Sequence, residues 1–189
     1  MTGRDAAEQI LHREGLYDVR IEHISGNLTD HYDPRTKTLR LSDATYNSTS
    51  VAALGVAAHE CGHAVQHARA YSFLKLRSAL VPAVQFTSNI VGWVLLGGIL
   101  LVNVFPALLL VGILMFALST LFSFVTLPVE IDASKRASQW LQGAGITSYS
   151  EHSMAVDALK SAAYTYVVAA LSSLATLIYY VAVYMSRRE

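Results

Sequence analysis

The sequence contains a long stretch without a charged side chain, residues 78–129, which reads SALVPAVQFTSNIVGWVLLGGILLVNVFPALLLVGILMFALSTLFSFVTLPV. A shorter uncharged stretch, residues 161–186, lies near the carboxyl end. The 14 basic and 14 acidic side chains all lie outside these two stretches. A soluble domain of 189 residues can bury one apolar helix, but hardly a segment of this length. The sequence therefore predicts an integral membrane protein and excludes an ordinary soluble globule.

The long uncharged stretch predicts a transmembrane helical hairpin. A helix rises roughly 1.5 Å per residue, so about 20 residues cross the hydrocarbon core. We place the two crossings at residues 79–102 and 106–127; one continuous helix would have to pass Pro106 without breaking. A third apolar segment, about residues 162–185, either spans the bilayer or packs mainly against protein.

Outside the apolar stretches, the first 77 residues predict a small soluble region. The turn signal Asp33–Thr36, followed by the alternating residues 38–42, predicts a β-hairpin. A helix of mostly small apolar residues should follow over residues 51–70. The expected fold is mostly α-helical, with a small β-hairpin and about three transmembrane helices. Its expected regions are a soluble part at 1–77, a transmembrane hairpin at 78–129, a polar region at 130–160, and a third transmembrane helix with a tail at 161–189.

The predicted helix over residues 51–70 contains an HExxH motif, His59-Glu60-Cys61-Gly62-His63. Residues four apart share one face of a helix, so both imidazoles can reach one zinc ion. Glu60 would project beside that metal, where it can take a proton from water and pass it to a leaving amine. Two histidines that merely cap a helix or form hydrogen bonds are the alternative.

A catalytic zinc keeps three protein ligands and one open position, so a third ligand is needed. His67 lies eight residues after His59, roughly 12 Å along a helix, which is too far for all three histidines to bind one ion. We interpret His67 as a residue that contacts the site from outside, or simply as a packed histidine. Cys61 faces another side of the helix and is expected to be a small buried filler.

Glu130 is the better candidate for the third ligand. It directly follows the second apolar crossing, where a carboxylate taken alone is usually an interfacial charge. If residues 78–129 cross the membrane twice, Glu130 returns to the side that holds His59 and His63. A single crossing would separate them and abolish the site.

Four stretches together resemble the YugP-type bacterial membrane zinc metallopeptidases: Leu28–Pro34, Leu39–Ser42, Val51–His63 and Thr126–Ala137. The resemblance covers nearly the whole chain. It implies a gluzincin-like helical core with one Zn²⁺ per chain, bound by His59, His63 and Glu130. It also implies that Glu60 is the catalytic acid/base. Members of this family commonly begin with a further hydrophobic segment, whereas this chain begins with a polar helix.

The placement of Glu130 is also similar to that in HtpX-like and CAAX prenyl proteases, where membrane helices separate the HExxH helix from the glutamate helix. Those proteases carry an Asp four residues after the glutamate ligand, where this chain has Ser134. Ser134 is therefore a candidate for contacting the metal ligands from outside. Asp132, two residues after Glu130, is expected to point elsewhere.

The residues before the HExxH helix offer candidates for substrate binding. The strand at residues 38–42 could be an edge that holds an extended peptide by main-chain hydrogen bonds, or an ordinary core hairpin. His31 and Tyr32 could orient substrate or stabilise a tetrahedral intermediate, although a packed loop histidine is the commoner outcome.

Basic residues flank the predicted transmembrane hairpin, namely Arg69, Lys75 and Arg77 before it and Lys135 and Arg136 after it. The connection near Asn103 carries no charge. By the positive-inside rule the zinc site should face the cytoplasm, in a bacterial cytoplasmic membrane. Arg187 and Arg188 argue the other way if the third segment spans.

We therefore expect a membrane-embedded zinc endopeptidase whose partners are the lipid bilayer and a peptide or membrane-protein substrate. A formal net charge of zero argues against nucleic acid as a partner, and the lone Cys61 excludes an internal disulfide. The alternative is a non-catalytic membrane protein in which zinc is structural, with a fourth ligand such as His31 or His67. A metal transporter is disfavoured because the crossings offer only amides and hydroxyls, among them Gln85, Asn89 and Asn103.

Overall fold

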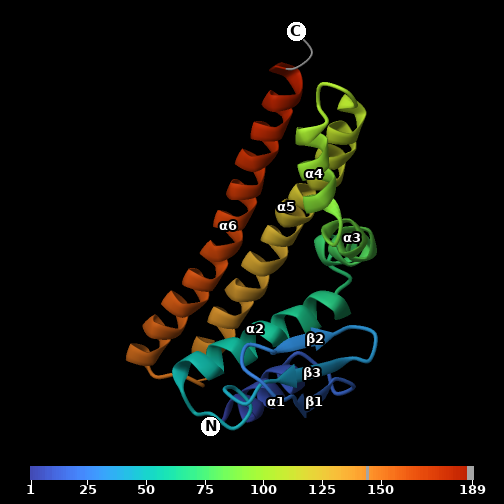
Figure 1. Cartoon of the computed structure of the whole chain (residues 1–189). Coiled ribbons are helices and arrows are strands. Elements are labelled where there is room, and N and C mark those ends of the chain that lie inside the picture. The colour runs from blue at the N-terminus through green and yellow to red at the C-terminus, as the bar shows by residue number, and fades with distance from the viewer. Residues whose placement is uncertain (144, 187–189) are drawn as a thin grey trace. The chain divides into compact units, whose positions relative to one another are not determined.

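The computed structural model describes residues 1–143 and 145–186 and is mostly helical, with one small sheet. This agrees with the fold class expected from the sequence; the chain beyond residue 186 lies outside the described residues. The elements in chain order are α1 (Gly3–Arg13), β1 (Arg20–His23), β2 (His31–Asp33), β3 (Thr38–Leu41), α2 (Val51–Ala68), α3 (Ser72–Ser88), α4 (Val91–Leu100), α5 (Pro106–Gly143) and α6 (Tyr149–Ser186) (Figure 1).

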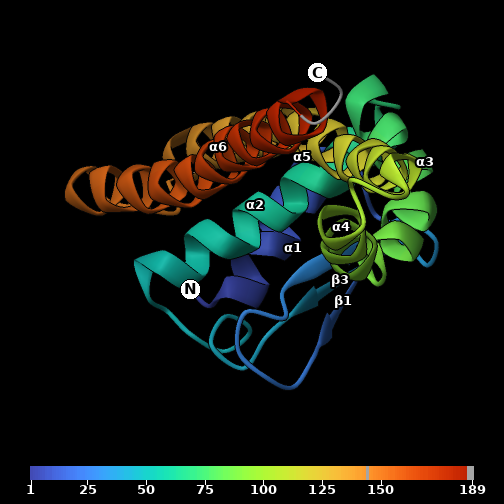
Figure 2. The same ribbon diagram turned by 45° about the horizontal axis from the view of Figure 1, so that its top comes forward.

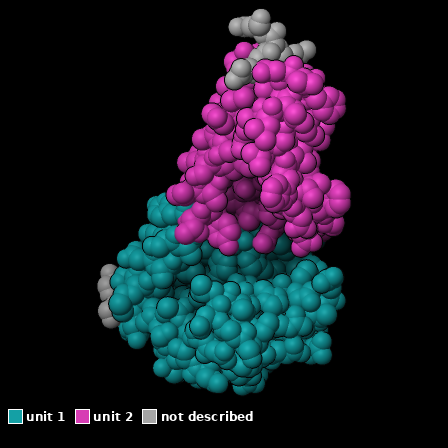
Figure 3. Space-filling model, viewed as in Figure 1, with its two compact units in different colours: residues 1–74, 129–164 teal, residues 75–128, 165–189 magenta. Residues whose placement is uncertain are grey.

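The chain forms two compact units, which Figure 3 shows in different colours. Unit 1 comprises residues 1–74 and 129–164, and unit 2 comprises residues 75–128 and 165–189. The long helices α5 and α6 each contribute one part to unit 1 and another part to unit 2. All residues of the candidate site described below belong to unit 1.

The core of unit 1 is built around the packing of α1 against α2 (Figures 1 and 2). Helix α1 begins with a capping box, in which Thr2 and Asp5 each accept a hydrogen bond from the other's backbone N–H. Its buried face consists of small and branched apolar residues, namely Ala6, Ala7, Ile10 and Leu11. Cys61 of α2 is fully buried in this core, and its thiol donates to the carbonyl of Ala7 at 3.7 Å. Burial raises the pKa of this thiol, so Cys61 is the small filler that the sequence predicted.

The sheet of unit 1 has the strand order β1-β3-β2. The predicted hairpin is present, since β2 and β3 pair antiparallel with Tyr32 opposite Leu39. Asp33 shapes its turn by accepting hydrogen bonds from the backbone N–H of Arg35 and the hydroxyl of Thr36. Strand β1 adds to the other side of β3 in parallel, with Ile21 opposite Leu39. Strand β3 is therefore central and buried, not an edge, and of the two readings of residues 38–42 the core strand is the one observed.

In unit 2 the first predicted crossing is not one straight helix. Helices α3 and α4 meet at a bend of 49°. Just before the bend, the Thr87 hydroxyl donates to the backbone carbonyls of Ala83 and Val84, in the preceding turn of α3. Helix α4 then packs tightly on α5. The approach is so close that a Cβ added to Gly98 would lie only 2.6 Å from the Cα of Leu109. Leu95, Val102, Leu109 and Ile113 form the buried centre of this packing.

Two helices are long and apolar enough to cross a bilayer, Pro106–Gly143 and Glu151–Ser186. A third crossing results if the bent pair α3 and α4 is counted as one span. Helix α5 passes Pro128 without a break, so the polar residues after it continue the same helix. Glu130 therefore lies on the same helix as the apolar segment and belongs to unit 1.

Candidate metal centre

Three side chains from two helices meet in unit 1. His59 and His63 lie one turn apart on α2. The N-cap of this helix is Ser50, whose side chain accepts a hydrogen bond from the backbone N–H of Ala53. Glu130 approaches from α5, and its Oε2 lies 3.1 Å from Nε2 of His59 and 3.6 Å from Nε2 of His63. The two imidazole rings stand edge to face, with their centroids 4.9 Å apart. Both rings therefore present the same type of nitrogen to the same carboxylate oxygen.

This geometry fits a zinc ion. The three ligand atoms lie within 4.8 Å of one another. Two ligands of a tetrahedral zinc at 2.0–2.1 Å are roughly 3.3 Å apart, close to the separations found here. Nitrogen and carboxylate donors suit zinc, and in the described part of the chain no fourth His, Cys, Asp or Glu joins the group. Three donors without a fourth leave room for one further ligand.

The electrostatics of the group also favour a cation. Glu130 is 2% exposed, and a carboxylate buried to that extent needs a positive partner. Burial alone would lower the pKa of His63, but the hydrogen bond to Glu130 and the negative charges of Glu60 and Glu130 outweigh it. The net result is a raised pKa for His63, so positive charge is stabilised at the point where the three side chains meet.

Glu60 lies next to His59 on α2 and is half-buried. Its negative charge is near enough to act on His63. It is not among the three residues of the metal group, and its role as catalytic acid/base stays a prediction.

The other ring nitrogen of each histidine, Nδ1, also has a hydrogen-bonding partner. Nδ1 of His59 lies 3.1 Å from the hydroxyl of Ser134, one turn after Glu130 on α5. Nδ1 of His63 lies 3.0 Å from Oε1 of Gln66. Ser134 thus lies against His59, and its role beside a metal ligand stays a prediction. Such contacts orient metal-binding imidazoles in zinc proteins.

Gln66 was not predicted to take part in the site. It is fully buried and connects His63 to Asp132, whose carboxylate accepts from the Gln66 amide at 2.9 Å. The described contacts of Asp132 go to Gln66 and Arg136 and not to His59, His63 or Glu130, so it points away from the metal ligands and reaches His63 only through Gln66. The available signal was a lone amide about one turn after His63, on a helix whose other residues are small or apolar apart from its three histidines and Glu60.

The remaining predicted residues form contacts outside this group. The Tyr32 hydroxyl and Nδ1 of His67 are 2.9 Å apart, which joins β2 to the end of α2. His31 is bound within the sheet region, with Nδ1 at 2.7 Å from the Thr29 carbonyl and Nε2 at 3.4 Å from Arg40. None of these described contacts includes His59, His63 or Glu130, so a role in substrate binding stays a prediction for His31 and Tyr32.

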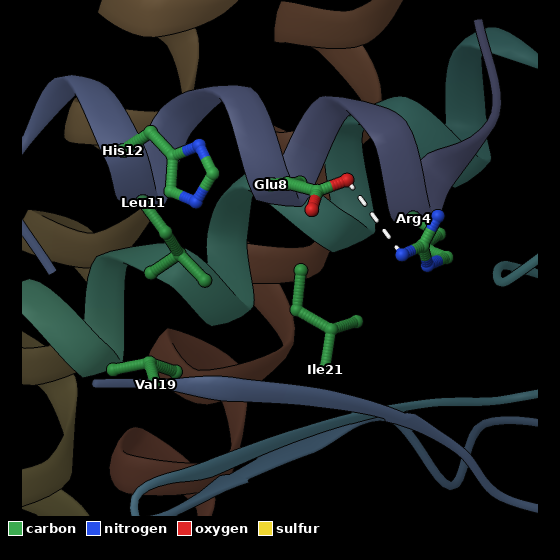
Figure 4. A pocket seen from close by; sticks show the side chains of 6 residues that line it. All are labelled: Arg4, Glu8, Leu11, His12, Val19 and Ile21. Atoms are coloured by element: carbon green, nitrogen blue, oxygen red, sulfur yellow. Dashed lines mark ion pairs between the residues drawn. The ribbon is translucent and has the colours of Figure 1, made fainter. Parts of the chain in front are cut away.

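A small hollow of about 100 Å³ lies between α1 and β1 (Figure 4). An ion pair between Arg4 and Glu8, 3.7 Å long, closes one side of it. The hollow is lined by Arg4, Glu8, Leu11, His12, Val19 and Ile21. None of these residues belongs to the metal group, and the hollow is not the candidate active site.

Comparison with known proteins agrees with this geometry. The family described as "Putative neutral zinc metallopeptidase" matches residues 1–185. A protein of Bacillus subtilis (strain 168) named "Putative membrane protease YugP" is 42% identical over 188 residues, which cover 100% of this chain and 83% of that protein. No solved structure matches the chain significantly. Since the match extends over nearly its whole length, the chain belongs to the neutral zinc metallopeptidase family.

Proposed function

We propose that the protein is a membrane-embedded zinc endopeptidase whose metal ligands are His59, His63 and Glu130. The observation that carries the proposal is the meeting of these three side chains with ligand atoms within 4.8 Å, although 66 residues separate His63 from Glu130 in the sequence. A solvated surface cluster would not be buried as Glu130 is. Membership of a zinc metallopeptidase family supports the same reading.

In this proposal three residues of the chain bind the metal and a fourth, Glu60, transfers protons. When bound, zinc supplies a Lewis acid that polarises the scissile carbonyl and makes water a stronger nucleophile at neutral pH. The carboxylate of Glu60 would take the proton from the attacking water and deliver it to the departing amine nitrogen. His59, His63 and Glu130 keep their positions during these steps because they sit on two packed helices. The three-residue ligand set leaves space for a substrate carbonyl.

The apolar helices support an attachment to the membrane. In the most apolar 18-residue stretch of α6 only 6% of the residues are buried inside the protein. Large apolar side chains such as Leu171 and Ile178 are therefore exposed on its surface. Exposed apolar faces of this extent are stable in lipid and not in water. We propose that the substrate is a peptide or a membrane-protein segment presented near the bilayer, because Glu130 lies on the helix that leaves the apolar segment.

The cationic residues around the hairpin favour a zinc site on the cytoplasmic side. Arg77 precedes the first apolar stretch, and Lys135 and Arg136 follow the second, whereas the connection between α4 and α5 carries no charge. This pattern obeys the positive-inside rule if unit 1 is cytoplasmic. Labelling of single cysteines introduced at Asn103 and at Lys135, in spheroplasts, would test the assignment, with Cys61 replaced by Ala.

Cleavage by the purified protein tests the proposed function directly. The full chain, in detergent or lipid nanodiscs with stoichiometric zinc, is incubated with a broad peptide library. We expect cleavage by the unaltered protein, and none by Glu60→Gln, which should retain its zinc because Glu60 is not a ligand. His59→Ala should lose both zinc and cleavage. If the zinc-loaded protein cleaves nothing, or if Glu60→Gln cleaves normally, the proposed catalytic role is wrong.

A further inference from the structure

Gln66 is a fully hydrogen-bonded side chain beside the candidate metal centre. It has no exposed surface, and it makes three hydrogen bonds. Its Oε1 lies 3.0 Å from Nδ1 of His63, and its Nε2 donates to the Val129 carbonyl at 2.8 Å and to Asp132 Oδ2 at 2.9 Å. Both the oxygen and the nitrogen of the Gln66 amide therefore have hydrogen-bonding partners.

The two acceptors determine which way the amide points. A carbonyl oxygen has no hydrogen to give, and an ionised carboxylate only accepts. Arg136 donates to the same oxygen of Asp132 at 2.7 Å, which keeps that carboxylate charged and in place. If the Gln66 amide were turned over, its oxygen would face two other oxygens, and two buried hydrogen bonds would be lost. The NH₂ group must therefore face α5, and the amide oxygen must face His63.

This orientation decides which nitrogen of His63 carries the hydrogen. The amide oxygen can only accept, so a neutral His63 ring must donate from Nδ1. Its Nε2 then carries the lone pair, and this is the nitrogen directed toward Glu130. A ring protonated on Nε2 instead could not bind a metal there.

We propose that Gln66 and Asp132 are positioning residues that hold His63 in the Nδ1–H tautomer, with its Nε2 lone pair directed at the metal. The inference rests on the proposed function only in taking His63 as a zinc ligand. Asp132 fixes the amide of Gln66, and Gln66 fixes the imidazole. Hydrogen bonds thus connect four residues of α2 and α5: His63 donates to Gln66, Gln66 donates to Asp132, and Arg136 donates to the same carboxylate of Asp132.

His59 provides an internal contrast. Its Nδ1 contacts the hydroxyl of Ser134, which can either donate or accept. That contact orients the ring of His59 without determining its tautomer. Ser134→Ala is therefore a matched control, since it removes an outer hydrogen bond from a predicted ligand but leaves the tautomer of His63 unchanged.

The tautomer can be measured without any catalytic assay. The full chain, labelled with ¹⁵N in its histidine rings, is purified in detergent, stripped of metal, and studied by NMR at a pH where the His63 ring is neutral. The Nδ1 resonance of His63 should have the shift of a protonated nitrogen and the Nε2 resonance that of an unprotonated one. Gln66→Met, similar in size but without an acceptor of this strength, should show a mixture of both tautomers.

Zinc affinity, measured by competition with a chelating dye, gives the second readout. Loss of an outer hydrogen-bonding partner of a metal ligand typically costs 10–100-fold in affinity, and we expect a loss of about this size for Gln66→Met. Asp132→Asn keeps the shape of the side chain but accepts either orientation of Gln66, so about a tenfold loss and a partial mixture of tautomers are expected. Asp132→Asn also keeps the inference testable if Gln66→Met fails to fold.

Two results would overturn the inference. One is a neutral His63 ring that carries its hydrogen on Nε2 and not on Nδ1 in the unaltered, metal-free protein. The other is an unchanged tautomer together with unchanged zinc affinity in Gln66→Met or, if that variant does not fold, in Asp132→Asn. Neither result depends on peptide cleavage, so a protein that binds zinc but cleaves nothing would contradict the proposed function and leave this inference standing.

Discussion

Gly62 of α2 lies directly against the backbone of Ala133 in α5: a Cβ added to Gly62 would be 2.9 Å from the Cα of Ala133 and 3.0 Å from its carbonyl oxygen. Backbone cannot rotate away as a flexible side chain can, so Gly62→Ala must push the two helices apart. We expect a loss of about 1–3 kcal/mol in the free energy of unfolding. Zinc should also bind more weakly, because the contact lies between the two histidines and Glu130. Denaturant unfolding and dye competition would measure the two effects.

Gly55, two turns earlier on the same helix, offers the matched control. A Cβ there would meet only the side chain of Leu159, at 4.0 Å. Gly55→Ala should leave zinc affinity unchanged and raise stability by up to about 1 kcal/mol, since alanine favours the helix more than glycine does. If the two variants behave alike, close approach of α2 to α5 does not determine the geometry of the site.

The charge of Glu130 should be needed for zinc binding and not only its shape. Glu130→Gln is nearly isosteric, but it removes the anion to which both Nε2 atoms are directed. We expect zinc affinity to fall by more than about a hundredfold, beyond the usual effect of losing an outer contact. Metal content after gel filtration, together with dye competition, would show this loss.

An exposed carboxylate of unit 1 gives the comparison for Glu130. Glu151 is bonded to Ser148 near the start of α6 and takes no part in the metal group. Glu151→Gln should therefore keep full zinc affinity. Stoichiometric, tight zinc in Glu130→Gln would remove Glu130 from the ligand set and, with it, the mechanism proposed above.

Removal of the metal should lower stability by an amount that depends on zinc concentration. A ligand that binds only the folded state stabilises it by about 2.7 kcal/mol at a hundredfold excess over its dissociation constant. The melting temperature in detergent should therefore rise steadily as zinc is added back after chelation. In His59→Ala the same titration should give a nearly flat response, and an equal rise there would mean that the zinc binds elsewhere.

The sequence was sufficient to group His59, His63 and Glu130, for reasons that are local or topological. Helical periodicity places two histidines four residues apart on one face. The length of the uncharged stretch, compared with the thickness of a bilayer, then brings Glu130 back to the same side. Both arguments use spacing along the chain and need no knowledge of side-chain orientation.

The features that sequence reasoning missed all depend on contacts between distant segments. The role of Gln66 exists only because α2 and α5 approach closely enough for its amide to reach the Val129 carbonyl and Asp132. The central position of β3 depends on parallel pairing with β1 across an intervening hairpin strand, and no local turn signal encodes such pairing. The bend between α3 and α4 lies beside the hydrogen bonds of Thr87, within a segment that carries no charged side chain to mark it.

The contact between Tyr32 and His67 should become visible at alkaline pH. Burial, assisted by the negative charges of Asp18 and Asp33, raises the pKa of Tyr32 from 10.0 to about 12. A raised pKa means that the fold favours the neutral phenol, so its contribution to stability is complete below about pH 10 and is lost as the pH rises from about 10 through about 12. The absorbance of tyrosinate should show a late-titrating component that is smaller by one tyrosine in Tyr32→Phe and unchanged in the control Tyr17→Phe. Tyr32→Phe should also lose about 1 kcal/mol at neutral pH, together with its hydrogen bond to His67. A late component of undiminished amplitude in Tyr32→Phe would assign it wholly to other tyrosines and would contradict the burial of Tyr32 against α2.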